Sequence, residues 1–401
     1  MNEPVAFSIT IGAALSLALT PVWIASARGF FGASVLGSLV VAALVASPMV
    51  TRWMGMTHQT SSHEFRAQMV FLMGAAASVG ALLWCRTVLP TGVVAALYGV
   101  GMFAATALHP NPLLATNVWR WGFAMPTTVL LLALAMLAGK RWFELLAVVL
   151  LAMSNALAGG RSDSGILLMV AVILAWQHRP RFSHRSSSAI TAVALVGMLA
   201  YGAYRALSGA ALEGYLGEAA QDRTQAQIAL SGSLILGGRP EIGATVELLR
   251  TNPIGFGPGT VPAPADILVA KTGMSRLGYD PDNGYVERYM LGQGKFELHS
   301  LVGDFWAAYS IVGLLLVIAI AVLVLHYLGL GLASSTGSAI GFFLALRTLW
   351  DIGFSPIVSS IDQLILAVAV LLLPAVRGHR SFLSGTTNGD IHRRPTPMRR
   401  G

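Results

Sequence analysis

Charge is scarce in this sequence. Only 11% of its 401 residues are charged, whereas 55% are hydrophobic. Soluble domains carry about 25% charged residues, so a soluble protein of this length could not cover its surface with so few. A lipid bilayer removes the difficulty, because lipid contacts most of the exterior of a membrane protein. The composition therefore predicts an integral membrane protein.

Cysteine is nearly absent as well. Cys85 is the only one, so an internal disulfide is excluded and any exported loop must be held by packing and hydrogen bonds. The N-terminus lacks the basic residues of a signal peptide: Glu3 is the only charge before the first apolar run, and other runs follow. We therefore expect the first run to be a membrane span.

Long apolar runs dominate what is present. A helix that crosses the hydrocarbon core needs about 20 mostly apolar residues. The sequence predicts an all-α, polytopic transmembrane helix bundle of about eleven spans, or twelve if a re-entrant piece lies near 110–114. The predicted spans are 5–25, 30–50, 68–84, 91–108, 122–138, 142–158, 165–176, 189–207, 301–325, 332–350 and 357–376.

The short connections set the orientation, because basic residues accumulate in cytoplasmic loops. The turn at 178–185, the pair Lys140 and Arg141, and the tail at 377–401 are rich in arginine or lysine and fall on one predicted side. We expect that side, with the C-terminus, to be cytoplasmic. The formal net charge of +8 is then a topology signal and not an indication of nucleic-acid binding.

Four regions follow from this topology. They are an N-terminal transmembrane bundle at 1–207, a large helical loop at 208–300, C-terminal transmembrane helices at 301–376 and the basic tail. The loop holds ten of the 18 acidic residues and is predicted to be outside, together with the connections at 51–66, 110–121 and 159–164.

The long loop carries several local signals. Residues 241–251 predict a short helix that Asn252 and Pro253 end, since proline disfavours helix at the residue before it. The segment 255–259 (GFGPG) predicts tight turns or close backbone approach. In 280–284 (DPDNG) we expect an Asx-turn and not a calcium site, because no bidentate glutamate follows at the required distance.

Two arginines do not follow the rule that basic residues accumulate in cytoplasmic loops. Arg120 and Arg161 lie at span boundaries in short connections on the predicted outer side, where a cation at lipid depth is costly. They could reach the headgroups or pair with an acid such as Asp163. The alternative is an anion site, because the guanidinium fork matches phosphate oxygens. Arg239 and Arg288, in the long loop, are further candidates for binding a lipid-linked pyrophosphate and its glycan.

His299 lies where the loop re-enters the membrane. A lone histidine at such a boundary is more often structural than catalytic. Imidazole is nevertheless the side chain best suited to accept a proton near neutral pH, and nearby arginines favour its neutral form. No nucleophile elbow and no metal-ligand spacing is present, so His299 acting as a general base is the chemistry that the sequence supports best.

The order of these motifs resembles the O-antigen ligase family, within a larger group that includes O-antigen polymerases and some protein O-glycosyltransferases. The resemblance covers roughly 119–325. It rests on Gly159-Gly160-Arg161, then Gly238-Arg239 before a short helix, then Asn252-Pro253 with the glycine-rich segment, and last His299-Ser300 followed by Gly313.

The resemblance implies an inverting glycosyltransferase of the bacterial inner membrane whose active site faces the periplasm. It implies neither a nucleotide-sugar donor nor a metal or other cofactor. The donor would be an undecaprenyl-pyrophosphate-linked glycan, and the acceptor would be lipid A–core. Arg161 and Arg239 would hold the pyrophosphate, and His299 would deprotonate the acceptor hydroxyl.

The sequence departs from the family pattern at three positions. Ser162 follows Arg161 where glycine is usual, Ser300 follows the histidine where asparagine is commoner, and Ser310 occupies a position that is commonly glycine. A polymerase that extends a lipid-linked glycan is the first alternative function, and a protein O-glycosyltransferase is the second. A membrane transporter, which would predict paired charges or broken helices near the middle of the membrane, is the alternative from another class.

Overall fold

A computed structural model gives the fold. It describes residues 4–5, 9–109, 112–177, 239–334 and 336–375, together with scattered positions between 194 and 231. The predicted cytoplasmic turn at 178–185, most of the predicted span at 189–207 and the basic tail lie outside the described residues.

Five helices in the described part are long and apolar enough to cross a membrane. They are α3 (Ala33–Met54), α4 (Ser62–Val88), α5 (Thr91–Leu108), the helix Trp119–Leu137 that joins the π-helical turn η2 (Trp119–Phe123) to α6 (Ala124–Leu137), and α14 (Leu301–Ser334). The prediction of a helical membrane bundle is confirmed to this extent. The count of eleven or twelve spans stays a prediction.

Six further helices occupy other predicted spans but have fewer than 18 residues. They are α1 (Ile11–Ala18), α2 (Thr20–Ala27), α7 (Arg141–Leu157), α8 (Arg161–Gln177), α15 (Ala339–Phe354) and α16 (Ile357–Leu371). In the described chain the only strands are β1 (Pro4–Val5) and β2 (Ile9–Thr10), which form a short antiparallel pair.

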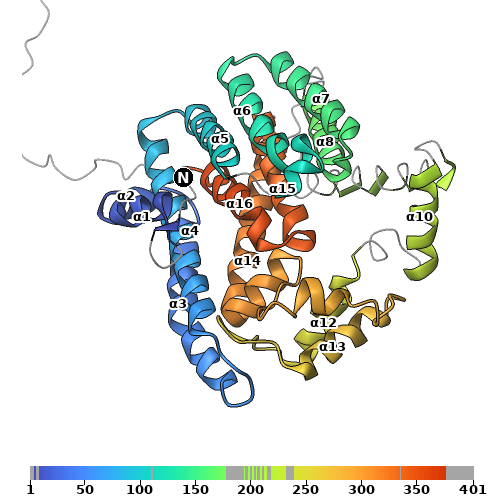
Figure 1. The fold of residues 1–401 in the computed structure, drawn as a ribbon. Helices are drawn as coiled ribbons and strands as arrows, with labels where there is room; N and C mark the ends of the chain where they lie inside the picture. Colours follow the sequence, from blue (N-terminus) through green and yellow to red (C-terminus); the bar gives the residue numbers. More distant parts are fainter. Residues whose placement is uncertain are drawn as a thin grey trace, which may run out of the picture.

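Helix α15 forms the centre of the bundle. It packs against α6, α7, α8, α14 and α16, and Figure 1 shows it in the interior among them. Its first eight residues, all apolar, are buried. A helical stretch that is apolar on every side is expected in such a position, because no face of it needs to meet water.

The connections gather at two ends of the bundle. At one end Asp163, at the start of α8, pairs with Arg347 in the last two turns of α15, and the backbone N–H of Ile357 donates to Asp304 in the first turn of α14. The α3–α4 connection reaches the same end, where the Val261 N–H donates to the Gln59 carbonyl. We call this the loop end. At the opposite, basic end, Arg141 donates to the Gly337 carbonyl.

The large loop contains α10 (Glu218–Ser231), α12 (Glu241–Thr251), α13 (Pro264–Ser275) and the π-helical turn η3 (Val286–Met290). The last three form a small helical layer at the loop end. The predicted helix at 241–251 and its end at Asn252 are confirmed. The predicted Asx-turn is confirmed too, because the Asp282 N–H donates to the Asp280 side chain.

This layer shares a second apolar core with the bundle. Buried side chains of α12, α13 and η3 pack against Trp306 and Ala307 of α14 and against Met54 of α3. Figure 1 shows α12 and α13 beside the beginning of α14. From α12 onward the loop is therefore fixed to the bundle by burial.

Helix α14 is broken where the glycine-rich segment meets it. Tyr309 and Ser310 leave the helical conformation, and Ser310 has φ 61° and ψ −160°. The N–H groups of Phe256 and Gly257 both donate to the Ala307 carbonyl, at 3.1 and 2.9 Å. A Cβ at Gly255, which has φ 93°, would collide with the Trp306 carbonyl. The predicted close approach of the segment 255–259 is confirmed, and its partner is α14.

The strain at Ser310 leads to a stability prediction. Its backbone region is almost restricted to glycine and costs other residues about 1–3 kcal/mol, while glycine loses about 0.5–1 kcal/mol in backbone entropy. We therefore expect Ser310→Gly to raise the free energy of unfolding by about 1 kcal/mol, which thermal unfolding in detergent would measure. Ser154→Gly, within regular helix α7, should lower it. A Ser310→Gly protein no more stable than wild type would contradict the strained conformation.

Candidate functional site

Buried polar groups fix the backbone on both sides of His299. The Leu298 N–H donates to Asp304 Oδ1 at 2.6 Å, and Ser300 Oγ accepts from the Gly303 N–H at 3.1 Å at the start of α14. Leu298, Ser300 and Asp304 are all buried. His299 itself has φ 56°, a left-handed conformation that is unfavourable for a non-glycine residue. The surrounding hydrogen bonds hold it there.

The imidazole of His299 has one nitrogen engaged. Its Nδ1 lies 3.2 Å from the Glu297 carbonyl oxygen. A carbonyl can only accept, so Nδ1 carries the hydrogen of this bond. In neutral imidazole the lone pair is then on Nε2, and Nε2 is the atom that can accept a proton. The residue is half-buried.

Tyr285 links His299 to the start of α12. The rings of Tyr285 and His299 are 6.3 Å apart between centroids, and the Tyr285 hydroxyl donates to Glu241 Oε1 at 2.5 Å. Burial, followed by the negative charge of Glu241, raises the pKa of Tyr285, whereas the positive charge of Arg239 acts to lower it. The hydroxyl therefore stays protonated at neutral pH. Arg239 lies two residues before Glu241 in the chain. Among the described residues no contact joins Arg239 to His299, so their convergence stays a prediction.

Arg161 begins α8 at the loop end. Its neighbour Asp163 pairs with Arg347, which also bonds Asp351 through Nε at 3.0 Å. The proposed pairing of Asp163 with a boundary arginine thus occurs with a different arginine, on α15. In the described part of the chain no ion pair is found for Arg161. Arg161 and His299 share the loop end of the bundle, but no direct contact joins them there.

Arg120 and Arg288 contact groups that are close to them in the chain. The Arg120 guanidinium covers the ring of Trp121, 4.8 Å from its centroid. Arg288 donates to two carbonyls of its own turn, those of Gly284 at 3.1 Å and Asn283 at 2.5 Å. Each guanidinium therefore has a local partner. Within the described residues neither shows a contact with His299.

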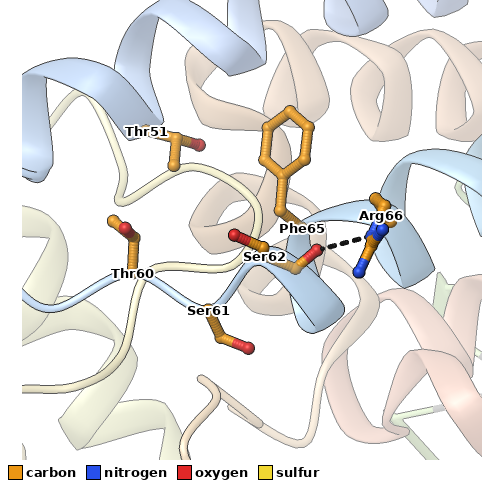
Figure 2. Close-up of a pocket in the computed structure, with 6 residues that line it drawn as sticks. All are labelled: Thr51, Thr60, Ser61, Ser62, Phe65 and Arg66. Atoms are coloured by element: carbon orange, nitrogen blue, oxygen red, sulfur yellow. Dashed lines mark hydrogen bonds between the residues drawn. The ribbon is translucent and has the colours of Figure 1, made fainter.

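Two cavities open at the loop end. An apolar groove of about 290 Å³ lies between α12, α14 and α15 and includes Ser300, which follows His299 in the chain. A pocket of about 370 Å³ is lined mostly by hydroxyl side chains of the α3–α4 region. Figure 2 shows its lining, in which Arg66 donates to the Ser62 carbonyl. None of the five residues predicted for the site lines this second pocket.

Sequence reasoning missed three residues of the site. Glu241 and Tyr285 are 44 positions apart, and no local pattern joins them. Asp304 gave a signal, since an acid in the first turn after a serine N-cap marks a helix start. Among the described residues no group of three or more His, Cys, Asp or Glu side chains is arranged to hold a metal ion.

Comparison with known proteins adds no assignment: no protein-family model, no curated protein and no solved structure matches the chain.

Proposed function

We propose that this protein is a glycosyltransferase of the O-antigen ligase type, which moves a glycan from undecaprenyl pyrophosphate to lipid A–core. The observation that carries the proposal is the arrangement of His299, whose Nδ1–H is engaged by a carbonyl, beside Tyr285, whose hydroxyl bonds Glu241 two residues after Arg239. A proton acceptor and a cation are the two groups that a metal-independent glycosyl transfer from a pyrophosphate would use.

The proposed reaction is a single displacement. The acceptor hydroxyl gives its proton to Nε2 of His299 as its oxygen attacks the anomeric carbon of the donor. The bond from that carbon to the pyrophosphate oxygen breaks on the opposite side, so the configuration inverts. Undecaprenyl pyrophosphate leaves with the bonding electron pair. Arg239 and Arg161 stabilise the negative charge on the departing oxygen.

The apolar groove supports a lipid-linked substrate. Its wall includes Ile242, Val246 and Leu249 of α12 and Trp306 and Leu314 of α14. A hydrocarbon chain that remains in contact with the bilayer can enter such a groove without leaving an apolar environment. Ser300 belongs to the same wall, so a chain in the groove would bring its head group close to His299.

The proposed location is the bacterial inner membrane, with the loop end in the periplasm and the C-terminus in the cytoplasm. The argument is the distribution of basic residues over the short connections. Lys140 and Arg141, at the basic end of the bundle, belong to the cytoplasmic side in this topology. Both substrates reach the periplasmic face, because their lipid parts stay in the membrane.

The test is transfer by purified protein in detergent, with undecaprenyl-pyrophosphate glycan and lipid A–core as the only substrates. We expect a glycosylated lipid A–core product. Arg239→Ala should lower the initial rate by about 10²–10³-fold through loss of charge stabilisation. The matched control is Arg250→Ala, an exposed arginine of α12, which should keep the wild-type rate.

Other outcomes would replace the proposal. Longer polyprenyl-linked chains without a lipid A–core product would identify a polymerase. If no transfer occurs, the protein would be reconstituted into sealed vesicles, where uptake of the donor would identify a transporter. Equal transfer rates for Arg239→Ala and Arg250→Ala would show that Arg239 does not take part in the reaction.

A further inference from the structure

The hydroxyl-lined pocket at the α3–α4 connection has the size and the chemistry of a binding site. Its volume of about 370 Å³ is in the range of pockets that hold small ligands. Thr51 comes from the end of α3, and the other lining residues come from the connection and the start of α4 (Figure 2). These others are Thr60, Ser61, Ser62, Phe65 and Arg66. The lining therefore combines four hydroxyls with one cation and includes no acid.

The pocket presents hydrogen-bond donors that are open to a ligand. Arg66 donates through Nε to the Ser62 carbonyl at 3.1 Å, and within the described residues Nη1 and Nη2 have no partner. The Ser61 hydroxyl accepts from the Glu64 N–H at 3.2 Å and keeps its own hydrogen. The hydroxyls of Thr60 and Ser62 bond no described residue. A guanidinium among open donors favours an anion with several acceptor oxygens, and phosphate oxygens match its planar fork.

The glycine-rich segment fixes the shape of this pocket. The Thr51 hydroxyl donates to the Pro258 carbonyl at 2.9 Å. The Ser61 N–H donates to the Gly259 carbonyl at 2.8 Å, and the Gly259 N–H donates to Gln68 Oε1 of α4 at 3.2 Å. The end of α3 and the start of α4 are thus bonded to the same short segment. The lining is in place before a ligand arrives, which lowers the entropy cost of binding.

The position of the pocket indicates where the phosphate comes from. Both α3 and α4 are long and apolar enough to cross a membrane, so the connection 55–61 between them belongs at a membrane surface. Met49 and Trp53, in the last turns of α3, are 69% and 47% exposed, as expected of side chains that contact lipid. Tryptophan is enriched at the level of the head groups. A phosphate at that level is most abundant as part of a lipid.

We propose that this pocket binds the phosphate group of a membrane lipid. The Arg66 guanidinium pairs with two phosphate oxygens, and the open hydroxyls of the lining donate to the phosphate as well. The acyl chains remain in the bilayer beside the exposed apolar side chains of α3. The five residues predicted for glycan transfer do not line the pocket, so lipid binding here needs no transfer reaction.

Three probes test the source of the phosphate. They are dioctanoyl phosphatidic acid, dioctanoylglycerol, which has the same chains without phosphate, and inorganic phosphate. Each is titrated into the full-length protein in detergent, and thermophoresis gives the Kd. We expect phosphatidic acid to bind at least tenfold more tightly than either of the others. Equally tight binding of inorganic phosphate would assign the pocket to a soluble anion, and equally tight binding of dioctanoylglycerol would assign the affinity to the chains. Either result would overturn the proposal.

Variants test the site itself. Arg66→Gln should raise the Kd for phosphatidic acid about tenfold, because hydrogen bonds from a charged donor are lost. Arg66→Lys keeps the charge but not the fork, so its Kd should lie between those two values. Thr60→Val removes one hydroxyl and should raise the Kd about threefold. The matched control is Arg250→Gln, an exposed arginine of α12, which should leave the Kd unchanged. Equal Kd values for wild type and Arg66→Gln would overturn the site.

Thermal unfolding separates binding from folding. Without lipid, Arg66→Gln should unfold at the wild-type temperature, because Arg66 is exposed and bonds the Ser62 carbonyl of its own helix. Phosphatidic acid should raise the unfolding temperature of wild type more than that of Arg66→Gln, since a ligand stabilises the folded protein in proportion to its binding. Equal shifts in the two proteins would mean that the lipid binds elsewhere.

Discussion

Changing His299 to asparagine is expected to lower the rate of glycan transfer by about 10²–10⁴-fold, the usual contribution of a positioned general base. An amide cannot take a proton near neutral pH. Asparagine is also tolerated in left-handed backbone better than most residues, so the φ of 56° at this position should survive the change. Initial rates at saturating donor and acceptor measure the loss, and thermal unfolding shows that the fold is kept.

Two further variants sharpen this prediction. His299→Ala removes the base and also the tolerance for positive φ, so it should lose stability as well as activity. His63→Asn is the matched control, because the His63 side chain is 75% exposed on the first turn of α4 and its rate should equal that of wild type. A His299→Asn enzyme with wild-type activity would show that another group accepts the proton.

Replacing Arg347 with alanine should lower the free energy of unfolding by about 3–5 kcal/mol, the cost of removing one partner from a buried ion pair. The Arg347 side chain is 14% exposed, and it joins Asp351, which is 3% exposed, to Asp163 of α8. Without the guanidinium, two carboxylates would remain together at the junction of α8 and α15. Thermal unfolding of the purified protein in detergent measures the effect.

The same triad offers its own control. Changing Arg347 to leucine while Asp163 and Asp351 become asparagine removes all three charges, and we expect this triple variant to recover most of the lost stability. Arg66→Ala serves as a second control. Arg66 is exposed and donates to the Ser62 carbonyl of its own helix, so its loss should change stability little. A stable Arg347→Ala protein would contradict the buried pairing.

Local signals in the sequence were sufficient for many helix positions. The predicted span at 91–108 coincides with α5, and the predicted helix at 241–251 coincides with α12. Both are bounded by proline or by a change to polar residues, so hydropathy and the backbone limits of proline define them without tertiary information. Asx-turn chemistry at Asp280 was predictable for the same reason.

Tertiary contacts explain what the sequence did not reveal. The run at 301–325 has no local sign of a break, and α14 departs from helix at Tyr309 and Ser310 where the segment 255–259 packs against it. The partner of Asp163 could not be chosen either, since Arg347 is 184 positions away. The candidate site follows the same pattern. His299 and Arg239 were predicted singly, whereas Tyr285, which lies beside His299 and bonds Glu241, emerged only from the fold.

The glycine-rich segment has a consequence for the order in which the chain assembles. Its Pro258 carbonyl accepts from Thr51 of α3, 207 positions earlier, while Phe256 and Gly257 donate to Ala307 of α14, which is made later. Contacts between such distant parts of a chain form late, because the chain between them must first be closed into a loop. During synthesis the segment cannot make its contacts with Ala307 until α14 has left the ribosome. His299, which lies two residues before α14, is therefore expected to become ordered only after α14 has joined this segment.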